Sequence, residues 1–148
     1  QEGNLEHFCE INDHCIRHLF FEEGSWANYA WYAFPQKQFA LQEEDIRPML
    51  TDWEGPTGCI ATDHIMVGGQ AVGYMCREEP GPGCQGDSGW RFFAGDEDAD
   101  YLGNPEYTGV YSLNVLCNYS PDIIKHLQAP YGTALFRGED GAFQAERL

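Results

Sequence analysis

The sequence has few basic residues and no long apolar run. Only 8 of its 148 residues are Lys or Arg, against 24 Asp and Glu, and the formal net charge is -16 at pH 7. Such a charge repels nucleic acid and anionic membrane surfaces, and it speeds encounter with a basic protein. No stretch approaches the roughly 20 apolar residues that span a bilayer, and no signal segment is visible at the start. We therefore expect neither a nucleic-acid partner nor a membrane partner.

Several motifs for site chemistry are missing as well. No Cys-x-x-Cys occurs, which disfavours a zinc ribbon or a thioredoxin-like redox site. Without a Gly-rich phosphate loop or a dinucleotide fingerprint, no cofactor is expected. The six cysteines would permit three disulfides, but a chain of this size folds without them, so reduced thiols are expected. Cys76 and Cys84 flank a Pro-Gly-Pro-Gly loop and are the pair best placed to meet.

The charge is spread evenly along the chain. Residues 1–57 hold 11 acids and 3 bases, and residues 58–148 hold 13 acids and 5 bases, so each part carries -8. The acidity could maintain solubility alone, or it could attract a basic partner. The length and a hydrophobic share of 43% suit a single compact domain. We expect this α+β domain at residues 58–148, with a helical and aromatic extension at residues 1–57.

The hydrophobic pattern predicts helices first and a sheet later. Apolar residues at helical spacing predict a helix over residues 5–21, and an aromatic run over residues 26–34 predicts a strand or buried connector. Further helices are expected at residues 43–50 and, with Ser120 as the cap, at residues 121–127. Strands are expected at residues 59–63, 71–77, 89–93, 110–113 and 133–137, with a hairpin at Gly68-Gly69 joining the first two. Helices packed on a mostly antiparallel sheet make the fold class α+β.

Three patterns suggest a metal site or an enzyme, and each is incomplete. His7, His14 and His18 would share one helix face, but a zinc-protease helix needs Glu after the first His of the motif, where this chain has Cys15. The acids at 96, 98 and 100 resemble the start of a calcium loop that lacks its later glycine and closing Glu. Ser88 lies in Gly-Asp-Ser-Gly, a serine-protease motif, in a chain too short for that fold.

The densest acidic run follows an aromatic strand. Asp96, Glu97, Asp98 and Asp100 come directly after residues 89–95, which include Trp90. A buried aromatic strand fixes the position of the residues that follow it, so the acids should lie on a well-ordered backbone at the edge of the sheet. Such an edge suits a cation, either a metal ion or a basic partner protein. The acid at 96 could alternatively cap a short helix that ends near Leu102.

Residues 58–143 resemble the bacterial polymorphic-toxin immunity proteins of family thirty-three. The resemblance rests on four stretches in the same order: Thr-Asp-His-Ile at 62–65, Val-Gly-Tyr-Met-Cys-Arg-Glu-Glu-Pro at 72–80, Asp-Ser-Gly-Trp-Arg-Phe-Phe-Ala-Gly-Asp-Glu-Asp at 87–98, and Asn-Tyr-Ser-Pro-Asp-Ile-Ile at 118–124 before Leu-Gln-Ala-Pro at 127–130. Cys76 and the insertion at 80–84 depart from the usual pattern, which leaves the geometry of that loop open. We recognise no family resemblance in residues 1–57.

The resemblance implies an α+β protein that binds and neutralises a cognate toxin made by the same cell. It implies no enzyme. Many such toxins are nucleases with basic clefts, which an acidic protein could cover. Tight binding also needs aromatic anchors at a desolvated centre of the interface, where Trp90 is a weaker choice because alternate residues of its strand point to opposite faces, one of them the core. The expected partner-binding residues are Asp96, Glu97, Asp98, Asp100, Tyr101, Tyr107 and Tyr119.

Two other functions stay open. The chain could be an acidic interaction module with no toxin partner, or a metal-binding or hydrolytic enzyme. A cytoplasmic location is expected, or a periplasmic one if the toxin acts on the cell wall. The toxin, its target, the mode of inhibition and the oligomeric state are not identified by the sequence.

Overall fold

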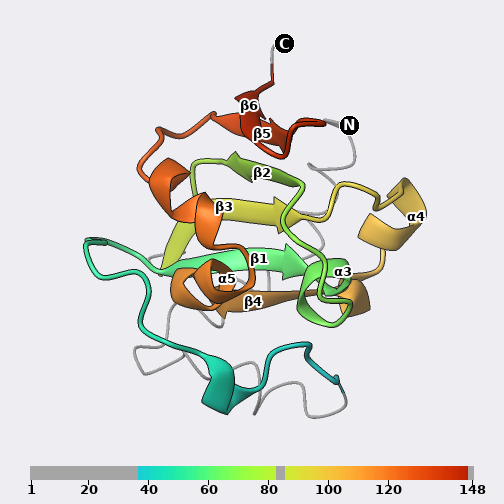
Figure 1. Cartoon of the computed structure of the whole chain (residues 1–148). Helices are drawn as coiled ribbons and strands as arrows, with labels where there is room; N and C mark the ends of the chain where they lie inside the picture. Colours follow the sequence, from blue (N-terminus) through green and yellow to red (C-terminus); the bar gives the residue numbers. More distant parts are fainter. Residues whose placement is uncertain (1–36, 83–85, 147–148) are drawn as a thin grey trace.

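A six-stranded mixed sheet forms the centre of the computed structural model, which describes residues 37–82 and 86–146 (Figure 1). The strands are β1 (Gly58–Thr62), β2 (Tyr74–Arg77), β3 (Asp87–Phe93), β4 (Thr108–Ser112), β5 (Ala134–Arg137) and β6 (Phe143–Ala145). Their order is β4-β1-β3-β2-β5-β6, and β1 and β3 run parallel while the other neighbouring pairs are antiparallel. The predicted α+β class and mostly antiparallel sheet are confirmed. The helix expected at residues 5–21 and the aromatic run at residues 26–34 lie outside the described residues.

Short helices connect the strands. The α-helices are α3 (Asp63–Met66), α4 (Ala99–Leu102) and α5 (Leu113–Tyr119), and the 3-10 helices are η2 (Glu43–Asp45), η3 (Pro105–Tyr107) and η4 (Pro121–His126). α5 begins directly after β4, where the Ser112 hydroxyl accepts a hydrogen bond from the Val115 N–H at 3.3 Å. This cap satisfies one of the N–H groups that a helix start leaves without an internal partner. Sequence reasoning missed α5 and β6.

The larger core lies on the face of the sheet that α5 and η4 cover, which we call the first face (Figure 1). Alternate strand residues point to it, among them Met75, Trp90 and Phe92, and they meet Leu116 and Ile123 of the helices. The second face carries a smaller apolar cluster: Ile60, Cys76, Phe93 and Val110 of the strands, with Leu102 of α4. The sheet is therefore apolar on both faces, and α4 approaches the second.

A bulge at the start of β3 explains the Asp-Ser-Gly-Trp-Arg stretch. Gly58 pairs with Asp87 but Ile60 pairs with Arg91, so β3 holds extra residues there. Gly89 has φ +91°, and a Cβ on it would lie 2.2 Å from the Glu78 carbonyl oxygen. The bulge brings the buried Arg91 guanidinium onto the Asp87 carboxylate in two hydrogen bonds of 2.7 and 2.9 Å. Charged groups are stable inside a protein when they are paired in this way.

The predicted hairpin across Gly68-Gly69 is wrong. The chain leaves β1 into α3, and β1 pairs with β3 and β4 and not with β2. β3 lies between β1 and β2 in the sheet. β2 pairs with β3 on one side and with β5 on the other. A glycine pair indicates a turn, but it carries no information on a strand that enters from later in the sequence.

Two predicted helices are shorter or differently built. The helix expected at residues 43–50 is reduced to η2, which ends before Pro48, a residue that disfavours helix at the position before it. Pro121 opens η4 as predicted, but η4 is a 3-10 helix and Ser120 makes no side-chain cap. The Ser120 hydroxyl instead accepts a 2.9 Å hydrogen bond from the Val72 N–H, because a core contact competes for it.

Candidate functional site

The acidic run after β3 is held by one of its own carboxylates. Glu97 accepts hydrogen bonds from the Ala94 N–H at 2.8 Å and the Gly95 N–H at 2.9 Å, and it also bonds the Thr62 hydroxyl at the end of β1. Asp98 caps α4 by accepting a 2.8 Å hydrogen bond from the Tyr101 N–H. The acids therefore lie on an anchored turn and a short helix, as the preceding strand led us to expect. The cap is Asp98, and not Asp96 as the alternative interpretation of this run proposed.

Aromatic rings stack beside this turn. The Tyr101 ring lies 4.2 Å from the His64 ring and 4.6 Å from the Tyr107 ring, centre to centre. The Tyr101 hydroxyl accepts a hydrogen bond from the His64 N–H at 3.1 Å. Burial raises the pKa of Tyr101, so its hydroxyl stays protonated at neutral pH. Tyr107, at the outer end of the stack, is 41% exposed and is the ring of this stack most accessible to a partner.

Asp96 and His64 form a hydrogen-bonded pair at the edge of the stack. Asp96 Oδ1 lies 2.7 Å from His64 Nδ1, and the hydrogen bond to His64 lowers the pKa of the Asp96 carboxyl. The pair links α3 to the turn after β3. We use the name acidic edge for Asp96, Glu97, Asp98, Asp100, Tyr101 and Tyr107.

The acidic edge brings together all the predicted partner-binding residues except Tyr119. Asp96, Asp98, Asp100 and Tyr107 are exposed, whereas Glu97 and Tyr101 are half-buried. Tyr119 is half-buried on α5, where its hydroxyl donates to the Met66 carbonyl at 2.7 Å and accepts from the Leu41 N–H at 3.0 Å. That hydroxyl connects elements of the fold, so Tyr119 has a structural role of its own. A role for any of these residues in partner binding stays a prediction.

A metal ion would have to compete with contacts that already exist here. His64, Asp96 and Glu97 offer one ligand atom each within 4.8 Å of one another. Glu97 already accepts hydrogen bonds on both oxygens, and the His64 Nδ1 is bonded to Asp96. Asp98 faces the α4 backbone, so the alternate acids do not converge as calcium ligands do. The arrangement is explained by the fold, and the trio His7, His14 and His18 lies outside the described residues.

Nucleophilic catalysis finds no support among the described residues. Ser88 is buried, donates to the Gly58 carbonyl at 2.5 Å and accepts from the Trp90 N–H, so the Gly-Asp-Ser-Gly motif builds the bulge. The described thiols, Cys59, Cys76 and Cys117, are free and buried. Burial raises the pKa of Cys76 and of Cys117 to about 12, which keeps both thiols protonated at neutral pH. Cys84, which the sequence places best to meet Cys76, is not among the described residues.

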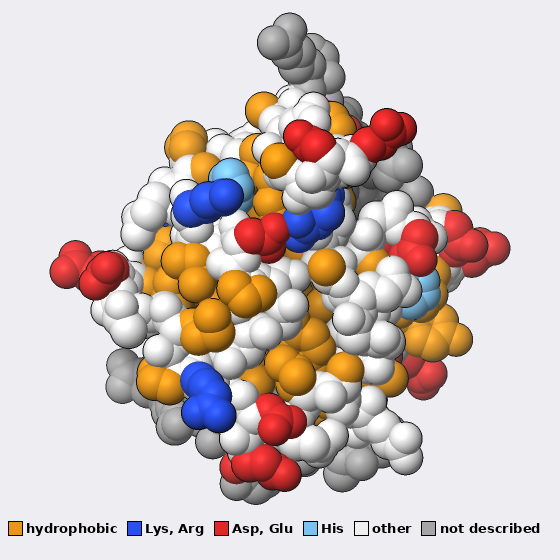
Figure 2. All heavy atoms as spheres, in the orientation of Figure 1, with side chains coloured by type: hydrophobic (Ala, Val, Ile, Leu, Met, Phe, Trp, Pro, Cys, Tyr) orange, Lys and Arg blue, Asp and Glu red, His pale blue; other side chains and the backbone are white. Residues whose placement is uncertain are grey.

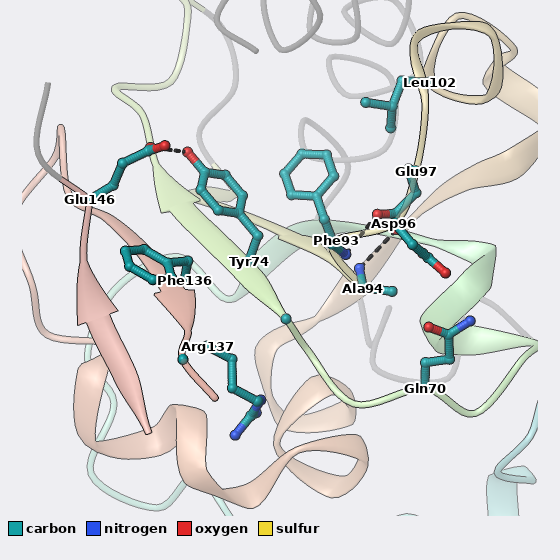
Figure 3. A pocket seen from close by; sticks show the side chains of 13 residues that line it. Gln70, Tyr74, Phe93, Ala94, Asp96, Glu97, Leu102, Phe136, Arg137 and Glu146 are labelled. Carbon is teal, nitrogen blue, oxygen red and sulfur yellow. Dashed lines mark hydrogen bonds between the residues drawn. The ribbon is translucent and has the colours of Figure 1, made fainter. Parts of the chain in front are cut away.

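A pocket of about 650 Å³ adjoins the acidic edge on the second face. Phe93, Tyr74 and Phe136 lie directly opposite one another on the neighbouring strands β3, β2 and β5, and they form an aromatic row (Figure 3). Glu146 stands at one end of the row and Asp96 and Glu97 at the other. The Tyr74 hydroxyl donates to Glu146 Oε2 at 2.8 Å. Sequence reasoning missed this pocket. Alternation along each predicted strand assigns Tyr74 and Phe93 to one face of their own strand, but only the order of the strands shows that the two side chains share a face of the sheet.

The basic side chains that the structure describes are mostly paired inside the fold. Lys37 binds Asp63 at 2.8 Å, and Arg137 binds Asp122 at 2.6 Å and the Val72 carbonyl at 2.9 Å. Arg77 donates to the backbone carbonyls of Ser88 and Ala129, and Arg91 pairs with the buried Asp87. Figure 2 shows acidic side chains mostly toward the rim of the first face, with several gathered at the edge where Figure 1 places α4. The outer surface at that edge is therefore negative.

The comparisons with known proteins identify one relationship. A family model described as the Immunity protein Imm33 domain matches residues 59–146. No curated protein and no solved structure matches the chain. Within the described residues, no helix has the length and apolar character needed to cross a membrane.

Proposed function

Because the chain belongs to the Imm33 family of immunity proteins, we propose that it binds a cognate bacterial toxin and neutralises it. The observation that carries the proposal is the family match over residues 59–146, which spans the whole sheet apart from the first residue of β1. We infer that protection comes from binding and not from catalysis. The buried Ser88 and the protonated thiols support this inference, because neither offers a nucleophile to a substrate.

The charge supports a basic partner. A toxin that cleaves nucleic acid needs a positive cleft to hold phosphates, and a protein of charge -16 complements such a cleft. Opposite potentials speed the encounter of two proteins, which suits an inhibitor that must capture its toxin before damage is done. We therefore propose that the chain covers the basic cleft of a nuclease-type toxin.

The acidic edge is the surface that we propose for this contact. Asp96, Asp98 and Asp100 supply exposed negative charge on a backbone held by Glu97. Tyr107 supplies an exposed ring that is backed by Tyr101, and a ring of this kind buries area at low entropic cost. A rigid acidic surface with an aromatic anchor combines rapid capture with a slow release. Tyr119, whose hydroxyl bonds Met66 and Leu41, is a separate candidate.

Growth assays test the function. Cells that express the toxin encoded beside this chain are expected to die, and co-expression of the chain is expected to restore growth. Asp100→Lys should weaken protection more than Glu139→Lys, which makes the same change in net charge at an exposed site in the loop between β5 and β6. Equal effects of the two variants would place the contact elsewhere, and failure of the unaltered chain to protect would contradict the proposed function.

A further inference from the structure

The charged groups that line the aromatic pocket on the second face are mostly acidic. Among the described residues that line it, Asp96, Glu97 and Glu146 are acidic and only Arg137 is basic. Strand alternation turns the Arg137 side chain to the first face, where its guanidinium binds Asp122 at 2.6 Å and lies over the Phe143 ring. In Figure 3 the Arg137 side chain points away from the aromatic row. Among the described residues, the charged groups on the pocket side are thus carboxylates, and they lie beside the aromatic row.

The aromatic rings and the carboxylates lie close enough together for one planar cation to stack on a ring and pair with a carboxylate. Phe136 is 38% exposed, and it lies directly across from Tyr74, whose hydroxyl holds the Glu146 carboxylate at 2.8 Å. An arginine guanidinium stacks on aromatic faces and pairs in two bonds with a carboxylate, which a lysine ammonium does not do. The volume of about 650 Å³ lies in the range of ordinary ligand pockets, roughly 300–1000 Å³, and admits an arginine together with a neighbouring residue.

The backbone around the pocket is held firmly. Gly73 approaches the β3 end so closely that a Cβ on it would lie 1.9 Å from the Ala94 carbonyl oxygen. The Gly73 N–H donates to the Phe93 carbonyl at 2.8 Å, and the Gly73 carbonyl accepts from the Arg137 N–H at 2.8 Å. β2 thus joins the two strands that carry Phe93 and Phe136. A pocket built on paired strands loses little entropy when it is filled.

We propose that this pocket binds an arginine side chain of the cognate toxin, stacked on Phe136 with its guanidinium on Glu146. The inference rests on the proposed function for the identity of the partner. The pocket adjoins the acidic edge through Asp96 and Glu97, so one toxin surface can contact both. The pocket then selects a toxin by one side chain, while the acidic edge attracts any basic surface.

Titration of the full chain with N-acetyl-arginine amide, followed by NMR of backbone amides, tests the pocket directly. Saturable shift changes are expected at β2, β5 and residues 94–97, and the uncharged citrulline analogue should not produce them. Phe136→Ala and Glu146→Gln should each raise the Kd for the arginine probe about two- to fivefold, as loss of one exposed cation contact does. Val67→Ala and Glu139→Gln alter exposed residues outside the pocket lining and should leave the Kd unchanged. Equal shifts with citrulline, or shifts spread over the surface, would overturn the inference.

Toxin binding separates this inference from the function on which it rests. If the unaltered chain binds the toxin and the double variant Phe136→Ala, Glu146→Gln binds it equally tightly, the pocket inference is wrong and the immunity function stands. If the arginine probe fills the pocket but the chain does not bind the toxin, the proposed function is wrong. Weaker toxin binding by the double variant, with unchanged binding by Glu139→Gln, is the result that supports the inference.

Discussion

Gly89 shows how one residue decides the meaning of a motif. In the sequence, Gly-Asp-Ser-Gly resembles a protease stretch, but Gly89 has φ +91° and forms the bulge that joins Asp87 to Arg91. Ser88 is buried in the same bulge and bonded to the backbone. Residues 87–91, which are part of the stretch that resembles the family, therefore have a structural role in forming the bulge. The sequence pattern alone does not distinguish a buried serine from a reactive one, because burial depends on strands that come from elsewhere in the chain.

Substitution of Gly89 by alanine tests the bulge. Gly141 is the matched control, because its φ of +85° is similar but an added Cβ would meet no atom within 4 Å. Gly141→Ala should lower the free energy of unfolding by about 1–2 kcal/mol, the cost of left-handed backbone. Gly89→Ala should cost about 1–3 kcal/mol more, because its Cβ would also meet the Glu78 carbonyl oxygen. Urea unfolding measures both, and equal losses would show that the bulge tolerates a side chain.

At the scale of elements, the positions of the strands in the sequence were predicted better than the pairing of the strands in the sheet. Five strand segments were placed from alternation and β-branched or aromatic residues, and all five overlap observed strands. The order of the strands was not predictable from local pattern, because β3 enters between β1 and β2 from later in the chain. α5 was missed because its seven residues directly continue a strand, and β6 because it has only three residues.

The acidic edge was predicted from the same local reasoning, and the pocket was not. Asp96 to Asp100 stand together in the sequence, so their proximity needs no tertiary information. His64, Phe136 and Glu146 come from distant segments and meet the others only through strand pairing. The division of the chain at residue 57 stays a prediction, although Phe39 and Trp53 from before that position pack on the core of the first face.

The Asp122–Arg137 pair ties η4 to β5 and should make stability depend on pH. The hydrogen bond to Arg137 lowers the pKa of Asp122 below its usual value near 3.9. A carboxyl with a lowered folded-state pKa stabilises the fold above its unfolded pKa, and this stabilisation is lost as the pH falls through the folded-state pKa. Asp122→Asn should therefore cost about 1 kcal/mol at pH 7, and this difference from the unaltered protein should shrink toward zero in acid.

Urea unfolding at several pH values from 7 down to about 2 measures that difference. Glu139→Gln is the control, because Glu139 is an exposed acid that makes no hydrogen bond or ion pair within the described residues. A loss in Asp122→Asn that is the same at every pH would mean that the pair contributes through packing and not through charge.

At the scale of the whole molecule, the distribution of charge matters more than its total. The described basic side chains are mostly paired inside the fold, whereas acids such as Asp98 and Asp100 stay exposed. Screening by salt acts on exposed charges over a length of about 8 Å at physiological ionic strength, and it acts less on buried pairs. Added salt should therefore weaken attraction to a partner while the internal pairs hold the fold together.

The central claim is that this immunity protein captures a basic toxin through its acidic surface. The most direct test is the association kinetics of the purified chain with the toxin encoded beside it, measured at low and at physiological salt. We predict a tight 1:1 complex whose association rate falls by about tenfold or more as salt rises, because steering is electrostatic. A complex whose association rate does not change with salt would contradict the acidic-surface mechanism, and the absence of any complex at low salt would contradict the immunity function itself.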